Sequence, residues 1–355
     1  MKAAVYYGDH DVRIEDRPMP VRGPGEALLK IVRSGICGTD ATEWRSGPLL
    51  FPVDRVHPLT GHTGPMILGH EFIGEVVETG GGFTVGDLVA SGAGVWCGEC
   101  PRCLEGRTNL CFNYYTLGLN IDGGMAEFVS CPERALVPVP VGLDVDLAGL
   151  AQPLAVGLHA ARRSGVADGD RVVLIGAGAI GSFVLAGILS LADIDVTVVD
   201  FAGPRLNRSL RIGASRIIEA GSDAVAQVME AVGPRGADVV IEASGAPGQL
   251  NNALAMVRTG GTILQVGLPS SEQPVHVHDL VMREVSIRTT LAHVCGEDLE
   301  PALAILATTN LGTELLDSVH PLGDIADQLE LLATGKLEGK VVFDPSFSST
   351  GKATT

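Results

Sequence analysis

The sequence predicts an α/β protein with two domains, one built from short strands and one with a doubly wound parallel sheet. Its 355 residues exceed the length that a single hydrophobic core usually serves. The first 32 residues alternate short apolar runs with Pro and Gly, which is typical of strands joined by turns. From Arg171 onward, strand-length apolar runs alternate with helical segments of about ten to fifteen residues, the pattern of parallel α/β sheets.

The segment 171–200 is the clearest unit of the parallel sheet. An apolar run enters the turn GAGAIG, a helix follows, and a second apolar run ends at Asp200. Gly176 allows a tight turn, Gly178 lets the backbone approach a phosphate, and Gly181 lets the helix pack on the strand. With an acid about 20 residues beyond the glycines, this is the fingerprint of a dinucleotide site. The alternative is an ordinary glycine turn.

We expect the dinucleotide to lie along the carboxyl ends of these strands. The Asp200 carboxylate can accept a hydrogen bond from a ribose 2′-hydroxyl but repels a 2′-phosphate, so we expect NAD rather than NADP. Arg205, on the next helix, is a further candidate contact, with a solvent-facing role as the alternative. The expected contacts are Gly176, Gly178, Ala179, Ile180, Gly181, Asp200, Arg205, Val266 and Gly267.

Four of the seven cysteines fall within fifteen residues, in the segment WCGECPRCLEGRTNLC. Such crowding in a cytosolic chain favours metal binding over disulfides. The CxxCxxC spacing and a fourth cysteine eight residues later can wrap a tetrahedral Zn²⁺, which is structural because four thiolates leave no open position. An iron–sulfur cluster is the alternative, although the fourth spacing does not match ferredoxins. The expected ligands are Cys97, Cys100, Cys103 and Cys111.

A second candidate metal site combines two separate segments. Cys37 lies between glycine turns in SGICGTD, and His70 and Glu71 come directly before an alternating strand at residues 72–78. Taken singly, each has a plainer interpretation as a structural histidine, a solvated carboxylate or a lone cysteine. Their order and spacing favour a shared site.

Charge and targeting features exclude several classes of partner. The net charge is −17 and basic residues form no cluster, so we expect no nucleic acid as a partner. The N-terminus lacks the features of a signal peptide, which predicts a cytoplasmic protein. The uncharged run 172–192 approaches membrane-spanning length, but it contains the nucleotide fingerprint, so we expect no membrane association.

Taken together, GICGTD, GHEF, CxxCxxCx7C, GAGAIG and Asp200 resemble the zinc-dependent medium-chain dehydrogenase/reductase family over nearly the whole chain. The resemblance implies a GroES-like β-barrel catalytic domain at residues 1–152, with the structural zinc lobe at about 93–113. It implies a Rossmann NAD-binding domain at 153–290, and a return to the catalytic domain with a flexible tail at 291–355. Members are usually homodimers or homotetramers, and bind one catalytic and one structural zinc per chain.

The resemblance also implies roles for single residues. Cys37 and His70 correspond to catalytic zinc ligands, with Glu71 beside them as a ligand or supporting group. Asp40 would accept a hydrogen bond from the far nitrogen of His70 and fix its tautomer. The third family ligand, usually Glu or Cys, is Gln152 here, which departs from the pattern.

The proton path departs from the family pattern as well. Thr39 takes the place of the hydroxyl that passes the substrate proton outward. The relay histidine that often follows five residues after the first cysteine is Thr42 in this chain.

The activity implied is oxidation of an alcohol to a ketone with NAD, in which zinc acts as a Lewis acid on the alcohol oxygen. The segment 51–72 looks most like that of bacterial 2,3-butanediol dehydrogenases, and less like sorbitol or threonine dehydrogenases, so we expect a secondary alcohol or vicinal diol as substrate. A polyol, sugar or cyclic secondary alcohol is the nearest alternative, and a catalytically silent dinucleotide-binding protein is an alternative of another class. The apolar residues of EWRSGPLLF either line a pocket for a bulkier alcohol or belong to the core: Trp44, Leu49, Leu50 and Phe51.

Overall fold

The computed structural model describes residues 1–346 of the chain, which form two compact units. One unit comprises Met1–Gln152 together with the segment from Val294 onward, and the other comprises Pro153–His293. The return to the first unit therefore begins at Val294 rather than at residue 291. The flexible tail that we expected lies, from residue 347 on, outside the described residues.

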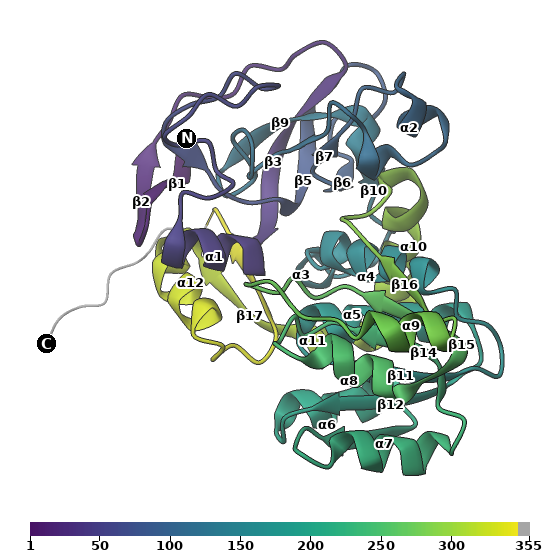
Figure 1. Cartoon of the computed structure of the whole chain (residues 1–355). Helices are drawn as coiled ribbons and strands as arrows, with labels where there is room; N and C mark the ends of the chain where they lie inside the picture. Colours follow the sequence, from purple (N-terminus) through teal and green to yellow (C-terminus); the bar gives the residue numbers. More distant parts are fainter. Residues whose placement is uncertain (347–355) are drawn as a thin grey trace, which may run out of the picture. The chain divides into compact units, whose positions relative to one another are not determined.

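The first unit consists mainly of strands (Figure 1). Its strands are β1 (Lys2–Gly8), β2 (Asp11–Asp16), β3 (Glu26–Gly35), β4 (Met66–Ile67), β5 (Glu71–Glu78), β6 (Leu88–Ser91), β7 (Gly94–Val95), β8 (Tyr115–Thr116), β9 (Phe128–Pro132), β10 (Leu136–Pro138), β17 (Leu316–Pro321) and β18 (Lys340–Asp344). Its helices are α1 (Gly38–Ser46), α2 (Pro101–Leu104), α3 (Val145–Ala148), α10 (Cys295–Thr308), α11 (Leu311–Leu315) and α12 (Ile325–Ala333), and α4 (Ala151–Ser164) leads into the second unit.

The larger sheet of this unit joins the two ends of the chain. Its strand order is β10-β6-β5-β3-β18-β17, with β9 also paired to β3. The late strand β18 lies antiparallel to the early strand β3, with Val342 opposite Gly35 and Phe343 opposite Ser34. Two smaller sheets, β2-β1-β4 and β7-β8, complete the unit.

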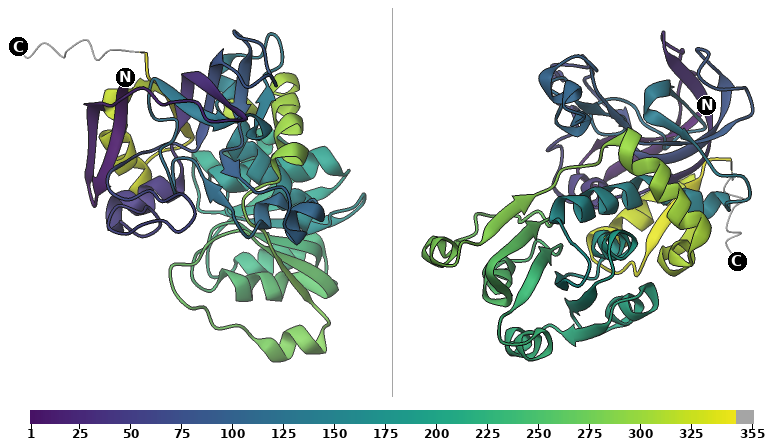
Figure 2. Two further views of the ribbon diagram at one scale, coloured as in Figure 1. Left: turned by 90° about the horizontal axis from the view of Figure 1, so that it is seen from above. Right: turned by 90° about the vertical axis from the view of Figure 1, so that its right-hand side faces the viewer.

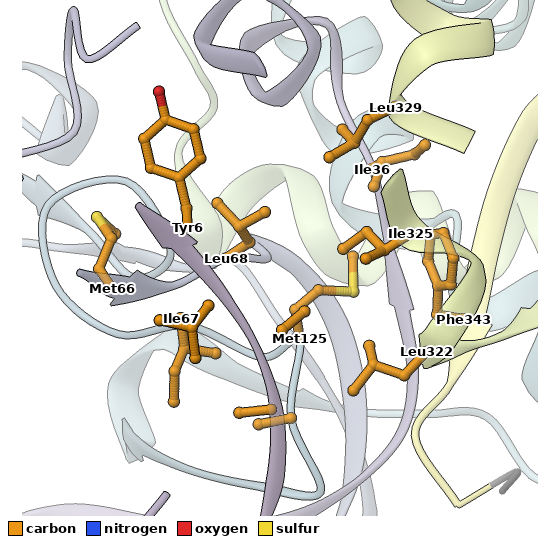
Figure 3. Packing of buried hydrophobic residues seen from close by; sticks show 14 of the residues in the cluster. Tyr6, Ile36, Met66, Ile67, Leu68, Met125, Leu322, Ile325, Leu329 and Phe343 are labelled. Atoms are coloured by element: carbon orange, nitrogen blue, oxygen red, sulfur yellow. The ribbon is translucent and has the colours of Figure 1, made fainter. Parts of the chain in front are cut away.

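One hydrophobic core draws on both ends of the chain (Figure 3). Tyr6 of β1 and Met66 of β4 are fully buried in the same cluster as Leu329 of α12 and Phe343 of β18. Apolar burial therefore holds the late segment, from α12 to β18, against the first strands.

The second unit is a parallel six-stranded sheet covered by helices (Figures 1 and 2). Its strands, in sheet order, are β13 (Arg216–Glu219), β12 (Asp195–Asp200), β11 (Arg171–Ile175), β14 (Ala237–Glu242), β15 (Val257–Gln265) and β16 (Ser286–Thr289). Every neighbouring pair is parallel. The helices are α5 (Ala179–Leu191), α6 (Pro204–Ile212), α7 (Ala224–Val232), α8 (Gln249–Met256) and α9 (Val277–Met282).

The central strand β11 is a continuous apolar run because both of its faces are buried. Val172 and Leu174 face one side of the sheet and pack with residues of α4, α5 and α6. Val173 and Ile175 face the other side and pack with residues of α7 and α8. A strand buried on both faces needs apolar residues at every position, so the alternation of apolar and polar residues is lost.

Within the described residues, no helix has the length and hydropathy needed to cross a bilayer.

Candidate active site and metal centres

The four clustered cysteines lie close together in a loop of the first unit. The Sγ–Sγ distances are 3.5 Å for Cys97–Cys111, 3.6 Å for Cys100–Cys103, 3.9 Å for Cys100–Cys111 and 4.0 Å for Cys97–Cys103. A tetrahedral zinc with Zn–S bonds of about 2.3 Å requires sulfur atoms about 3.8 Å apart. The spacing of the four sulfur atoms therefore fits one zinc ion.

Backbone N–H groups support thiolates at this site. The N–H groups of Cys97 and Asn113 point at Cys111 Sγ at 3.3 Å, and that of Cys100 points at Cys97 Sγ at 3.4 Å. Backbone donors at Phe112 and Cys103 lower the pKa of Cys100 to about 6. Since zinc binds the thiolate form, Cys100 favours the charge state that the metal needs, whereas burial raises the pKa of Cys103 to about 12.

The second cluster brings Cys37, His70 and Glu71 together, with one ligand atom from each within 4.8 Å of the others. Pairing of β3 with β5 places Gly35 opposite Glu71, so Cys37 and His70 lie just beyond the same ends of two adjacent strands. The spacing in sequence thus becomes a spatial cluster through strand register. Sulfur, imidazole and carboxylate are the ligand types of catalytic zinc sites.

Gly69 lets the chain turn into this cluster. Its φ is +98°, and a Cβ at this position would lie 2.7 Å from Ser34 Oγ and from the Met125 backbone nitrogen. A larger residue would clash with both neighbours and strain the backbone. Gly69 is therefore needed to present His70, which is 5% exposed.

Asp40 links the start of α1 to His70. Its Oδ2 accepts a hydrogen bond from the Cys37 N–H at 2.8 Å, while its Oδ1 lies 3.7 Å from His70 Nδ1. That second distance is too long for a hydrogen bond. The bond expected between Asp40 and His70 is therefore not formed here, because the carboxylate is oriented by the helix start. Asp40 Oδ1 and His70 Nδ1 are both buried without hydrogen-bond partners in the described part of the chain.

The cluster attracts positive charge. Burial alone would lower the pKa of His70, but Asp40, Cys37 and Glu71 outweigh burial and raise this pKa to about 9. Anionic groups around a buried imidazole create a field that favours a cation. Both the donor set and its electrostatics therefore fit zinc.

The dinucleotide turn lies in the second unit between β11 and α5. Gly176 has a φ of +101°, and a Cβ on Gly181 would lie 1.9 Å from the Gly176 carbonyl oxygen, whereas a Cβ on Gly178 would meet nothing within 4 Å. Two glycines are thus required by packing, while Gly178 leaves the start of the helix open. Asp200 ends β12, and its carboxylate accepts hydrogen bonds from the N–H groups of Ala177 and Phe201, both at 2.6 Å.

The remaining expected contacts lie around the same strand ends. Ala179 and Ile180 form the first turn of α5, Arg205 lies in the first turn of α6, and Val266 and Gly267 directly follow β15. The strand order β13-β12-β11-β14-β15-β16 corresponds to the 3-2-1-4-5-6 order of dinucleotide-binding sheets, in which the cofactor binds where the order reverses.

Family models match both units of the chain. The alcohol dehydrogenase GroES-like domain matches residues 23–141, and the zinc-binding dehydrogenase domain matches residues 179–308. Sorbitol dehydrogenase of Bacillus subtilis is 34% identical over 294 residues, covering 81% of each chain. The chain belongs to the zinc-dependent alcohol dehydrogenase family. The predicted family, fold class and enzyme class are thereby confirmed.

Two further comparisons match this dehydrogenase to proteins named butanediol dehydrogenase. The (R,R)-butanediol dehydrogenase of Bacillus subtilis is 33% identical over 311 residues, covering 86% of this chain and 88% of its own. A crystal structure of 2R,3R-butanediol dehydrogenase from the same organism matches with a TM-score of 0.89 at 29% identity, covering 97% and 99% of the two chains.

The structure divides the apolar stretch EWRSGPLLF of this dehydrogenase into two parts. Trp44 and Phe51 are 7% and 0% exposed and belong to the core. Leu49 and Leu50 are 51% and 57% exposed. Their N–H groups donate to the two carboxylate oxygens of Glu43, which is itself 1% exposed. Only these two leucines remain available to contact a ligand.

Lys340 contacts the ligand cluster through Glu71, and the sequence analysis did not predict this residue. Its Nζ donates to Glu71 Oε1 at 2.8 Å and to the Ile36 carbonyl oxygen, and lies 2.5 Å from Glu71 Oε2. Lys340 and Glu71 are 6% and 1% exposed. Burial alone would lower the pKa of Lys340, but the Glu71 and Cys37 charges raise it, so the ammonium group remains charged. The only hint in the sequence was a lysine at the start of the last apolar strand.

Three other predicted residues lie on α1 and α4. Thr39 is half-buried in the first turn of α1, and Gln152, at the start of α4, is 9% exposed. Thr42 is exposed, and its hydroxyl donates to the Gly38 carbonyl oxygen at 3.0 Å. The roles of Thr39 and Gln152 stay predictions.

Proposed function

We propose that this family member is an NAD-linked dehydrogenase that interconverts a secondary alcohol or vicinal diol with its ketone. The observation that carries the proposal is the cluster of Cys37, His70 and Glu71, together with Asp200 at the end of β12. The first supplies ligands for a metal with Lewis-acid chemistry, and the second suits the ribose of NAD.

The chain's own residues have distinct parts in the proposed reaction. When bound, zinc would polarise the alcohol oxygen, and NAD would accept the hydride. Cys37 and His70 would hold the metal, and Gln152 or Glu71 would complete its ligands. The Thr39 hydroxyl would take the alcohol proton and pass it toward solvent. Lys340 holds the Glu71 carboxylate by an ion pair, so a metal bound by Glu71 would share this carboxylate with the ammonium group.

The substrate class rests on the segment 51–72 and on similarity to proteins named butanediol dehydrogenase. The relative named sorbitol dehydrogenase supports the second candidate, a polyol or sugar.

A substrate panel tests the proposal. The zinc-loaded protein is offered NAD with 2,3-butanediol, sorbitol, cyclic secondary alcohols or ethanol, and, for the reverse reaction, NADH with acetoin. The formation or consumption of NADH is followed by absorbance. We expect secondary alcohols and diols to be oxidised faster than ethanol. Faster turnover of ethanol would overturn the substrate proposal, and no turnover of any alcohol would favour a catalytically silent protein.

A matched pair of cysteine variants ties activity to the cluster. Cys37→Ala should abolish turnover and remove one zinc per chain. Cys131→Ala is the control, because Cys131 is buried among apolar residues outside both clusters and should retain activity. If Cys37→Ala retained as much activity as an active Cys131→Ala variant, the assignment of Cys37 would be contradicted.

We also propose that the enzyme is a cytoplasmic homodimer or homotetramer. The strand β16 ends the six-stranded sheet, and all four of its residues are exposed. Val281 and Met282 of the preceding helix are 72% and 70% exposed. An exposed edge strand with apolar neighbours is suited to pairing with a second copy. Light scattering should report a dimer or larger for the wild type and a monomer for Ile287→Lys; a monomeric wild type would contradict the proposal.

A further inference from the structure

Glu242 is a buried carboxylate that the proposed reaction does not use. It ends β14 and is 1% exposed. Burying a carboxylate is costly unless its charge is compensated. A buried acid at the end of β14 therefore needs a physical explanation.

Within the described part of the chain, the hydrogen-bond partners of the Glu242 carboxylate are all neutral donors. Its Oε1 accepts bonds from the Ser244 N–H at 2.8 Å and from the Ser244 hydroxyl, and its Oε2 accepts one from Gln265 Nε2 at 2.5 Å. The Gly245 N–H points at both oxygens, at 3.0 and 3.1 Å. None of these donors carries a positive charge that would cancel a negative charge on the carboxylate. The carboxylate therefore projects a negative field into its surroundings.

The place of Glu242 in the sheet is next to the dinucleotide turn. Strand register puts Glu242 beside Ile175, the last residue of β11, and Gly176 follows. A Cβ on Gly176 would lie only 2.9 Å from the Ser244 nitrogen, so the two turns touch. With Asp200 marking the adenosine side at β12, the nicotinamide half of the cofactor belongs on the β14 side.

Glu242 also forms backbone hydrogen bonds with the turn after β15. Its backbone oxygen accepts bonds from the N–H groups of Val266 and Gly267, at 2.8 and 2.9 Å. Gln265, which bonds to the Glu242 side chain, donates to the Gly267 carbonyl oxygen at 2.8 Å. One residue thus connects both turns on the nicotinamide side.

We propose that Glu242 is a positioning residue whose charge favours binding of NAD⁺ over NADH. The nicotinamide ring is positively charged in NAD⁺ and neutral in NADH, so a fixed negative charge nearby stabilises only the oxidised form. For two unit charges on the order of 10 Å apart at an effective dielectric constant of about 20, Coulomb's law gives a change of this ratio on the order of tenfold. The inference rests on the proposed binding of NAD and adds to it a preference for one redox state.

The test measures the dissociation constants of NAD⁺ and NADH separately, by calorimetry on the zinc-loaded full chain. In Glu242→Gln, the ratio Kd(NAD⁺)/Kd(NADH) should rise about tenfold above that of the wild type. Asp238→Asn is the matched control, because Asp238 lies near the other end of the same strand and its Oδ1 accepts a bond from Arg258 Nε at 2.6 Å. Its ratio should stay at the wild-type value.

Further variants separate charge from packing. Glu242→Asp keeps the charge and should keep the ratio, even if both affinities fall. If Glu242→Gln does not fold, as judged by thermal melting, Gln265→Lys places a cation against Glu242 and should raise the ratio in the same way.

Each outcome has one meaning. A wild type that binds neither cofactor form overturns the proposed function itself. A wild type that binds both, with a Glu242→Gln variant or a Gln265→Lys variant whose two constants shift equally, overturns the inference and leaves the proposed function standing.

Discussion

Replacing Lys340 by Met should destabilise the enzyme strongly, because it leaves the Glu71 carboxylate buried without its cation. Lys340 Nζ lies 2.8 and 2.5 Å from the two Glu71 oxygens, and both residues are less than a tenth exposed. Removing one partner of a buried ion pair costs about 3–5 kcal/mol. For a unit of this size, about 2–4 °C of melting temperature per kcal/mol gives a loss of about 6–20 °C.

A double-mutant cycle isolates the pair. Lys340→Met, Glu71→Gln and the double variant are unfolded with urea at equal zinc content, which is checked by metal analysis. Each single variant leaves one buried group without its partner, so the double variant should lose less stability than the sum of the two. The measured coupling should be at least about 1 kcal/mol.

The exposed pair Lys2–Asp16 is the matched control. It has the same 2.8 Å separation and also lies in the first unit, but its side chains are 55% and 76% exposed. Lys2→Met should therefore cost no more than about 1 kcal/mol. If Lys340→Met costs as little as Lys2→Met, or if the two single losses in the cycle add, the reasoning from buried charge is refuted.

Three other predictions concern the metals and the cofactor. Cys103→Ala should reduce the zinc content from two to one per chain and lower the melting temperature, because structural zinc contributes directly to folding; full metal content would contradict this. Wild-type kcat/KM should be higher with NAD than with NADP, and Asp200→Ala should narrow the difference; equal or better kinetics with NADP would reject the role of Asp200. Gln152→Glu should keep the zinc and shift the alkaline-rising limb of the kcat/KM profile to higher pH, because a carboxylate reduces the positive charge at the metal; an unchanged profile would mean that Gln152 is not a ligand.

Features contained in one short segment could be predicted from the sequence. The four cysteines lie on one loop, so their spacing alone brings the sulfur atoms within 3.5–4.0 Å. The glycine turn of residues 176–181 likewise needs only the strand before it and the helix after it. In both cases local geometry decides the site, and no long-range pairing has to be known.

The apolar loop after α1 shows where such reasoning stops. Trp44 and Leu50 are both large apolar residues in one short segment, and hydrophobicity alone cannot separate them. The separation comes from Glu43, whose buried carboxylate holds the N–H groups of Leu49 and Leu50 and leaves these side chains exposed. A charged residue thus determines which apolar residues leave the core, an effect that no hydrophobic pattern encodes.

Lys340 could not be found from the sequence because it lies 269 residues from Glu71. Its place follows from two strand registers, in which β3 sets Gly35 opposite Glu71 of β5 and opposite Val342 of β18. Since β18 runs antiparallel to β3, the residues before Val342 extend past Gly35 toward Cys37. The ammonium group therefore reaches the ligand cluster because three strands end together, and its burial is tolerated because Glu71 and the Ile36 carbonyl oxygen accept hydrogen bonds from it. A lysine at the start of an apolar strand would otherwise be assigned to solvent, so its role becomes visible only when strand order and register are known.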